Sequence, residues 1–214
     1  MNDSTWTWMS GTDTANDPGV YSENGIPCSR VYATGWFDGS TQELWLFGGS
    51  YTDGNANGMS LSSSEKNDQL LNTSLGYFND LWKYRMNDST WTWVSGSAIR
   101  GQAGIYGSKG NASTMNVPGS RTGAIGWYDE STQEIWLFGG EGYHSIGNQG
   151  LLIQDYCLFL IRLILNSWLG CLNDLWRYRV NDSTWTWMAG NDAINEPGEF
   201  GEKGTLNENN VPSS

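Results

Sequence analysis

The sequence is poor in the residues that build most catalytic and metal-binding sites. It has one histidine, His144, and three cysteines, Cys28, Cys157 and Cys171, which follow no metal-ligand spacing and are too few for a disulfide scaffold. A Gly-x-Ser-x-Gly motif, which would mark a hydrolase nucleophile, does not occur, and nothing singles out a catalytic pair among the carboxylates. We therefore expect a non-enzymatic protein with no cofactor and no bound metal.

Positive charge is scarce as well. Lysine and arginine number 11 against 23 aspartate and glutamate residues, which gives a formal net charge of -12. Nucleic-acid binding needs clustered cations to neutralise phosphates, so the composition argues against that class of partner. The acidity is explained by solubility alone.

A long uninterrupted apolar run is also missing. The most apolar stretch, 151–165, contains Asp155 and Arg162, which makes it a poor membrane helix, so we do not expect a membrane partner. Within the apolar insertion 151–172, two alternatives stay open. One is a short helix packed on a sheet, and the other is an insertion without function, such as a translated intron.

Glycine, tryptophan and internal repetition are abundant. The phrase Asn-Asp-Ser-Thr-Trp-Thr-Trp occurs at 2–8, 87–93 and 181–187. Its two indoles are two residues apart and so share one face of a strand. Asn, Asp and Ser are typical of tight turns, because their side chains hydrogen-bond the nearby backbone. Each copy therefore predicts a tight turn followed by an outer strand with an aromatic face.

A second block is repeated at a constant offset. Residues 30–49 and 121–140 each predict a strand, a short turn and an apolar strand that ends in Gly-Gly, and Asn-Asp-Leu-Trp follows later in both copies. A loop frame with an aromatic residue between glycines recurs around Tyr21, Tyr106 and Phe200, and we expect that ring to lie against the sheet. The unit thus has four strands, and the fold class is all-β.

An apolar strand ending in Gly-Gly, then a tyrosine, then a tryptophan, resembles the kelch repeat, one blade of a β-propeller. The resemblance is closest to long-blade, Gly-rich kelch repeats and covers nearly the whole chain outside two long loops. It implies four-stranded antiparallel blades. Only two blades are complete in this sequence, which is too few to close a ring, so the expected fold is an incomplete propeller and the chain is expected to be a fragment of a larger one. The repeat marks are Gly48, Gly49, Tyr84, Trp91, Gly139, Gly140, Tyr178 and Trp185.

The predicted organisation follows from these repeats. Residues 1–29 are an outer strand of a preceding blade with its connecting loop, and 30–94 are blade 1 with a long loop at 50–78. Residues 95–120 connect the blades, 121–188 are blade 2 with the apolar insertion 151–172, and 189–214 are an unfinished connecting loop.

The long loops should all open on one face, because successive antiparallel strands alternate in direction. Binding residues concentrate on loops carried by a rigid scaffold, so this long-loop face is the predicted binding surface. Its candidate binding residues are Tyr51, Arg100, Tyr106, Lys109, Tyr143 and His144.

One loop partly matches a calcium-binding pattern. Asp53, Asn55 and Asn57 occupy the first three ligand positions and Gly58 the sixth, but position twelve is Ser64. Blade 2 has no counterpart, so an ordinary Asx-rich loop is the preferred interpretation.

The leading functional hypothesis is a protein-interaction module that holds a protein or peptide on the long-loop face. The alternatives are a carbohydrate-binding or glycan-active propeller, since exposed Trp and Tyr stack on sugars, and a truncated fragment without independent function. The sequence does not indicate a compartment.

Overall fold

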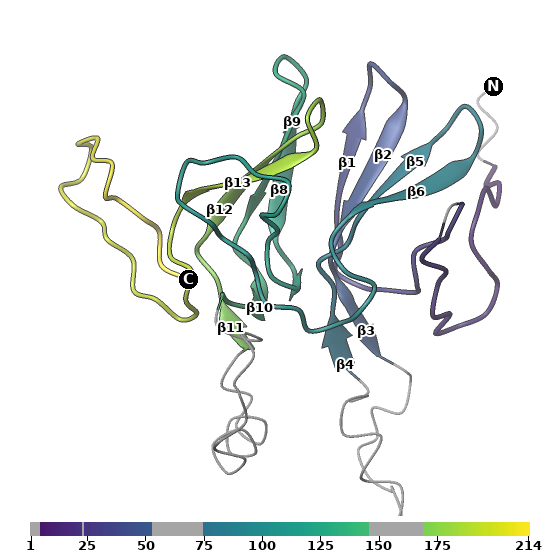
Figure 1. The fold of residues 1–214 in the computed structure, drawn as a ribbon, viewed down its shortest axis with the longest axis horizontal. Helices are drawn as coiled ribbons and strands as arrows, with labels where there is room; N and C mark the ends of the chain where they lie inside the picture. The colour runs from purple at the N-terminus through teal and green to yellow at the C-terminus, as the bar shows by residue number, and fades with distance from the viewer. Residues whose placement is uncertain (1–4, 23, 53–74, 146–168) are drawn as a thin grey trace, which may run out of the picture.

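The computed structural model describes residues 5–22, 24–52, 75–145 and 169–214 (Figure 1). These ranges contain thirteen β-strands and no helix. Within them, no helix is long and apolar enough to cross a bilayer. The protein is all-β, as the sequence predicts.

Two four-stranded antiparallel sheets form the body of the molecule (Figure 1). Both are meanders in which short turns join the first strand to the second and the third to the fourth, while a long excursion separates the second strand from the third. Sheet I contains β1 (Thr34–Asp38), β2 (Glu43–Phe47), β5 (Leu81–Arg85) and β6 (Thr90–Ser95), in that order. Sheet II contains β8 (Ile125–Asp129), β9 (Glu134–Phe138), β12 (Leu175–Arg179) and β13 (Thr184–Ala189), again in that order.

Two smaller sheets lie at the lower end of Figure 1, which is the long-loop face. One pairs β3 (Ser50–Thr52) with β4 (Leu75–Tyr77), and the other contains β7 (Arg121–Thr122), β10 (Glu141–Tyr143) and β11 (Leu169–Cys171). The chain leaves β2 for β3 through Gly48 and Gly49, whose φ angles are 64° and 96°. Gly139 and Gly140 repeat these left-handed angles at 63° and 92°, so Gly-Gly marks the bend in both copies.

Short turns close the opposite end, and their acidic side chains cap the backbone as predicted. In the first turn, the Asp38 carboxylate accepts hydrogen bonds from the Ser40 amide at 2.9 Å and the Thr41 hydroxyl at 2.7 Å. In the next turn, the Asp88 carboxylate accepts from the Thr90 amide at 3.2 Å. Such Asx turns fix the register of each hairpin.

The core lies between the two sheets. Trp45 and Phe47 of β2 point at sheet II, where their ring centroids lie 6.1 Å from Tyr178 and 5.6 Å from Trp185. All four side chains are buried. Burying a large apolar side chain stabilises a fold by about 1.5–3 kcal/mol, so these rings hold the sheets together.

The connecting loops carry small hairpins that pack on the sheet that follows. The ring of Tyr106 lies 4.8 Å from Trp176 and 5.1 Å from Trp187, and Tyr21 contacts sheet I in the same way. The predicted packing of these rings is therefore confirmed. The third hairpin, closed by the bridge between Glu199 and Val211, extends away from sheet II, and Phe200 is exposed (Figure 1).

The structure differs from the predicted strand at the start of the chain and leaves two other predicted segments undescribed in whole or in part. The outer strand predicted at 1–10 is wrong for residues 5–10, which form no strand and leave Trp6 fully exposed. A strand needs a neighbour for its backbone hydrogen bonds, and no described strand pairs with this segment. Of the insertion 151–172, residues 151–168 lie outside the described residues, while 169–171 form β11. The calcium candidates Asp53, Asn55 and Asn57 also lie outside them.

Candidate functional site

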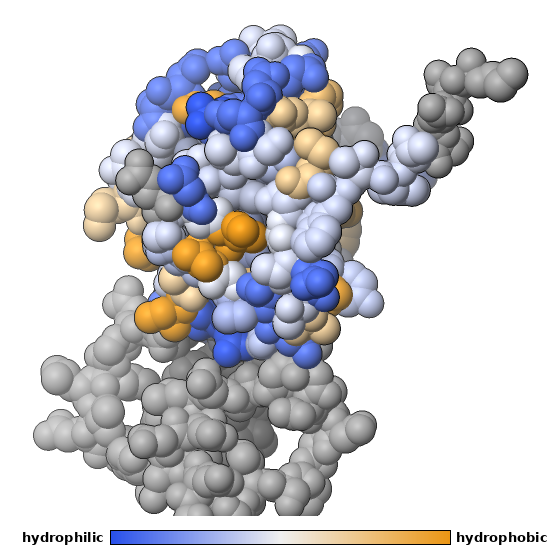
Figure 2. Space-filling view, turned by 90° about the vertical axis from the view of Figure 1, so that its right-hand side faces the viewer, coloured by the Kyte–Doolittle hydropathy of each residue, from blue (hydrophilic) through white to orange (hydrophobic). Residues whose placement is uncertain are grey.

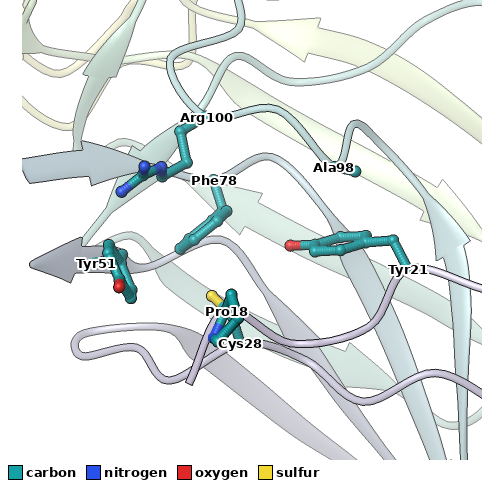
Figure 3. Close-up of a pocket in the computed structure, with 7 residues that line it drawn as sticks. All are labelled: Pro18, Tyr21, Cys28, Tyr51, Phe78, Ala98 and Arg100. Carbon is teal, nitrogen blue, oxygen red and sulfur yellow. The ribbon is translucent and has the colours of Figure 1, made fainter. Parts of the chain in front are cut away.

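A pocket of about 220 Å³ opens at the long-loop end of sheet I. Residues from four separate segments line it: the first connecting loop, β3, the start of the Asn-Asp-Leu-Trp segment and the loop after β6. The lining residues are Pro18, Tyr21, Cys28, Tyr51, Phe78, Ala98 and Arg100 (Figure 3). The pocket thus exists only because the sheet brings distant parts of the chain together.

The outer wall joins two of the predicted binding residues. The guanidinium of Arg100 lies over the ring of Tyr51, 4.7 Å from its centroid. The Tyr51 hydroxyl donates a hydrogen bond to the carbonyl of Asn16 at 3.2 Å, which orients the ring. Gly76 pairs with Tyr51 across β3 and β4, and a Cβ at Gly76 would lie 2.7 Å from the Arg100 side chain. A glycine is therefore needed for Arg100 to pack there.

The opposite wall is formed by Tyr21, with Phe78 between the two tyrosines (Figure 3). The Tyr21 hydroxyl donates to the Asp80 carboxylate at 2.6 Å, and burial together with that carboxylate raises the pKa of the phenol. Cys28 lies nearby, and burial raises the pKa of its thiol above the ordinary value. Both groups stay protonated at neutral pH, so neither is an activated nucleophile.

A buried ion pair supports the Tyr21 wall from behind. Arg30 donates to both oxygens of Asp80, at 2.6 and 2.8 Å, and to the carbonyl of Gly48 at 2.9 Å. The indole N–H of Trp82 donates to the same carboxylate at 2.6 Å. With these donors in place, the carboxylate is fully hydrogen-bonded, as a buried charge must be.

Sheet II contains the same network. Arg121 donates to both oxygens of Asp174, at 2.6 and 2.7 Å, and Tyr106 and Trp176 donate to that carboxylate at 2.6 and 2.7 Å. Because both sheets keep the network, we assign it to the scaffold. The sequence analysis did not single out Asp80 or Asp174, although the repeated Asn-Asp before an apolar strand was a signal for a buried polar pair.

The set of residues that lines this pocket is not repeated in sheet II. At the positions that correspond in sheet II, Gly142 replaces Tyr51, Ile194 replaces Arg100 and Gly119 replaces Cys28. Among these replacements, those of Tyr51 and Arg100 remove the charge of the pocket and its aromatic outer wall. A feature confined to one sheet is not required by the fold, so it is the better candidate for function.

The other predicted binding residues are scattered. Tyr106 is buried against Trp176 and His144 is buried as well, so neither side chain is exposed on the long-loop face. Lys109 packs on the outer strand of sheet II, where its ammonium lies 4.5 Å from the Trp187 ring centroid. Tyr143 is the last residue of β10 in the three-stranded small sheet, and its ring centroid lies 6.3 Å from that of Tyr77.

Sequence reasoning missed four lining residues of the pocket, Pro18, Cys28, Phe78 and Ala98. They are single apolar or small residues in segments far apart in the chain, and no pattern in the sequence connects them. The described residues contain no group of three or more His, Cys, Asp or Glu side chains placed to hold a metal ion.

Comparisons with solved structures add a weak likeness. No protein-family model and no curated protein matches the chain. A solved structure described as the structure of YjhT is similar to it with 14% sequence identity and a TM-score of 0.43. The match covers 79% of this chain and 40% of that one, so the chain spans less than half of that protein's length. A likeness at this level carries no conclusion about function.

Proposed function

We propose that the two sheets are kelch-like blades of a β-propeller and that the chain is a non-enzymatic protein-interaction module. The four-stranded meanders, the left-handed Gly-Gly bends and the cross-strand pairs of tyrosine and tryptophan support the blade assignment. The pocket at the long-loop end of sheet I is the binding site in this proposal. The observation that carries this proposal is that sheet II has Gly142 and Ile194 in place of Tyr51 and Arg100, so the scaffold does not need these two side chains.

The size of the pocket favours an amino-acid side chain as the ligand. Pockets for drug-sized molecules and cofactors are about 300–1,000 Å³, whereas this one is about 220 Å³. Phe78 and Tyr51 offer apolar and aromatic walls, and Arg100 is the only charged lining residue. A guanidinium presents a planar fork of N–H donors, which matches a carboxylate. We therefore propose a peptide that inserts an acidic side chain next to an apolar one.

A displayed library of short random peptides tests this proposal. Peptides selected on the 214-residue chain should carry an Asp or Glu beside an apolar residue. By calorimetry, Arg100→Ala and Tyr51→Ala should each weaken their binding by about tenfold or more, equivalent to roughly 1.4 kcal/mol. Arg85→Ala, a surface arginine at the opposite end of sheet I, and Tyr32→Ala, an exposed tyrosine outside the pocket, are the matched controls.

Two results would contradict the proposal. Selected peptides that bind the Arg100→Ala chain as tightly as the parent chain would place the site elsewhere. Glycan-array binding that depends on Tyr51, with no peptide selected, would favour the carbohydrate-binding alternative.

A further inference from the structure

Each sheet has one covered face and one face turned away from its neighbour, and the two free faces are not alike. The face of sheet I that packs on sheet II carries a set of large apolar residues. The free face of sheet II carries the equivalent set at the same strand positions. The pairs are Trp36 and Trp127, Trp45 and Trp136, Phe47 and Phe138, and Leu81 and Leu175.

In each pair the side chain on sheet I is buried and its counterpart on sheet II is more exposed to solvent. Trp36 is 6% exposed because sheet II covers it, whereas Trp127 is 46% exposed. Trp127 and Trp136 stack on the free face with a centroid distance of 5.7 Å and an interplanar angle of 3°. A broad aromatic surface of this kind is costly to leave in water and marks an interaction site.

The free face of sheet I repeats the other side of the same interface. Its Leu44 and Phe37 are equivalent to Ile135 and Tyr128, which receive sheet I in the structure. Leu44 is 40% exposed and Phe37 is 48% exposed, whereas Ile135 is fully buried. Figure 2 views the molecule from the side of sheet I and shows hydrophobic residues gathered among the polar ones.

A glycine gives this receiving face its shape. In the covered interface, a Cβ at Gly126 would lie 2.4 Å from the indole of Trp36, so Trp36 fits only against a glycine. Gly35 occupies the equivalent position on the free face of sheet I. A Cβ there would meet only the Trp45 carbonyl, at 3.5 Å. Gly35 therefore leaves open a slot of the kind that an indole fills against Gly126.

We propose that a second copy of this chain binds head to tail, with the free face of sheet II of one copy packed on the free face of sheet I of the next. Trp127 of one copy fills the slot at Gly35 of the other. The occupant is a copy because the two free faces carry, at equivalent strand positions, the same or similar apolar residues as the two sides of the interface that already joins sheets I and II. This proposal is independent of the peptide pocket.

An interface between two different surfaces propagates from copy to copy and closes into a ring when the rotation allows. Closed propellers hold about 4–8 blades, and each copy brings two sheets, so a closed ring would hold roughly two to four copies. One hydrogen bond is lost relative to the internal interface. Tyr128 donates to Asp38 at 2.9 Å there, whereas Phe37 has no hydroxyl to offer Asp129.

The hairpin at 198–211 must move to admit the second copy. The hairpins of Tyr21 and Tyr106 each pack on the sheet that follows them in the chain, so the hairpin at 198–211 is expected to pack on a sheet that follows sheet II. In the assembly that sheet is sheet I of the next copy, which is already covered by its own Tyr21 hairpin. The Tyr21 hairpin should stay bound to sheet I in preference to the 198–211 hairpin. The Tyr21 hydroxyl donates a hydrogen bond to Asp80, and Phe200 has no hydroxyl to make this contact. Phe200 and Leu206 are exposed in the structure, so displacing the hairpin uncovers little.

Sedimentation velocity and light scattering of the 214-residue chain test the proposal. We expect species at multiples of 23.7 kDa that dissociate on dilution. Trp127→Glu removes the contact on sheet II, and Gly35→Val fills the slot on sheet I without meeting its own chain. Each variant alone should be monomeric. An equimolar mixture should form a two-copy species, because each variant keeps the face that the other lacks.

Two controls keep the result interpretable. Met115→Glu changes an exposed apolar residue away from both faces and should assemble like the parent chain. Circular dichroism melts should show that Trp127→Glu and Gly35→Val remain folded, and Leu44→Glu is a second variant of the receiving face.

Three outcomes would overturn the proposal. The first is a monomeric parent chain at high concentration. The second is assembly of the Gly35→Val and Leu44→Glu variants at the parent level, which would indicate a symmetric contact of sheet II with sheet II. The third is a mixture of Trp127→Glu and Gly35→Val that stays monomeric.

Discussion

At the scale of the residue, one polar contact joins the two sheets at the short-turn end. The Asp38 carboxylate accepts hydrogen bonds from Ser40 and Thr41 in its own turn and from the Tyr128 hydroxyl of sheet II. Burial acts to raise the pKa of Asp38, but these hydrogen bonds outweigh burial and lower it to about 2. The carboxylate of Asp38 is therefore both a turn cap and a link between sheets.

This lowered pKa predicts a pH dependence of stability. A carboxyl whose pKa falls on folding stabilises the protein above its unfolded pKa, near 3.8, and the stabilisation is lost as the pH falls through about 2. Asp38→Asn should therefore lower the free energy of unfolding at neutral pH, and the difference from the parent should shrink between about pH 4 and pH 2. Urea unfolding across this range measures it.

Asp129→Asn is the matched control for that series. Asp129 caps the equivalent turn, with a hydrogen bond from the Ser131 amide at 2.9 Å, but it receives no tyrosine from another sheet. Its substitution should change stability less at neutral pH. A difference between parent and Asp38→Asn that is constant down to about pH 2 would contradict the assignment.

At the scale of the element, each outer strand ends at a glycine that meets the backbone of the preceding segment. Gly96 follows β6 with φ 84°, and Gly190 follows β13 with φ 81°. A Cβ at Gly190 would lie 2.1 Å from the carbonyl oxygen of Asn173, and the equivalent distance at Gly96 to Asn79 is 2.0 Å. The close approach lets the Asn173 side chain accept a hydrogen bond from the Asn191 amide at 3.0 Å.

Two alanine substitutions distinguish the stability lost to a left-handed backbone conformation from the stability lost to the clash with Asn173. Gly110→Ala introduces a left-handed alanine at φ 82° with nothing within 4 Å, so it should cost about 1–2 kcal/mol. Gly190→Ala adds the clash with Asn173 and should cost clearly more, measured by urea unfolding. Equal losses in the two variants would show that the contact with Asn173 relaxes freely.

Elements were predictable from sequence where a local pattern fixes them. The alternation in Trp-Thr-Trp, the Asx turns and the Gly-Gly bends each depend on neighbouring residues, and the corresponding strands and turns are present. The strand predicted at 1–10 failed for residues 5–10, because the same local pattern forms a strand only beside a partner. The partner of a strand is not encoded in the strand itself.

The candidate site was only partly predictable for the same reason. Tyr51 and Arg100 were both predicted as binding residues, but their contact depends on the packing of β3 against the loop after β6. The pairing of Arg30 with Asp80 crosses 50 residues and could not be inferred from spacing. The glycine frame around Tyr106 did predict a ring packed on the sheet, but it does not show that this burial removes the side chain from the binding surface.

At the scale of the whole molecule, the two sheets share one core. Phe47 of sheet I contacts Trp185 of sheet II, and both are almost fully buried. The sheets should therefore unfold together.

Phe47→Ala tests this coupling. Truncating a buried phenylalanine costs about 3–5 kcal/mol, and the loss should appear as faster hydrogen exchange in β12 of sheet II as well as in β5 beside it. Phe37→Ala, on the exposed face of the same sheet, is the control and should change exchange in β12 little. Protection of β12 that is unchanged in Phe47→Ala would show that the sheets open independently.

The stem formed by β3 and β4 has a consequence for protein engineering. The Arg30–Asp80 pair and the Gly-Gly bend hold the chain on both sides of this stem, so we expect the four-stranded sheet to tolerate changes in the segment that joins Thr52 to Leu75. Doubling the length of a flexible connection costs only about 0.6 kcal/mol. The stem can therefore accept foreign segments of differing length and display them beside the pocket of Tyr51 and Arg100.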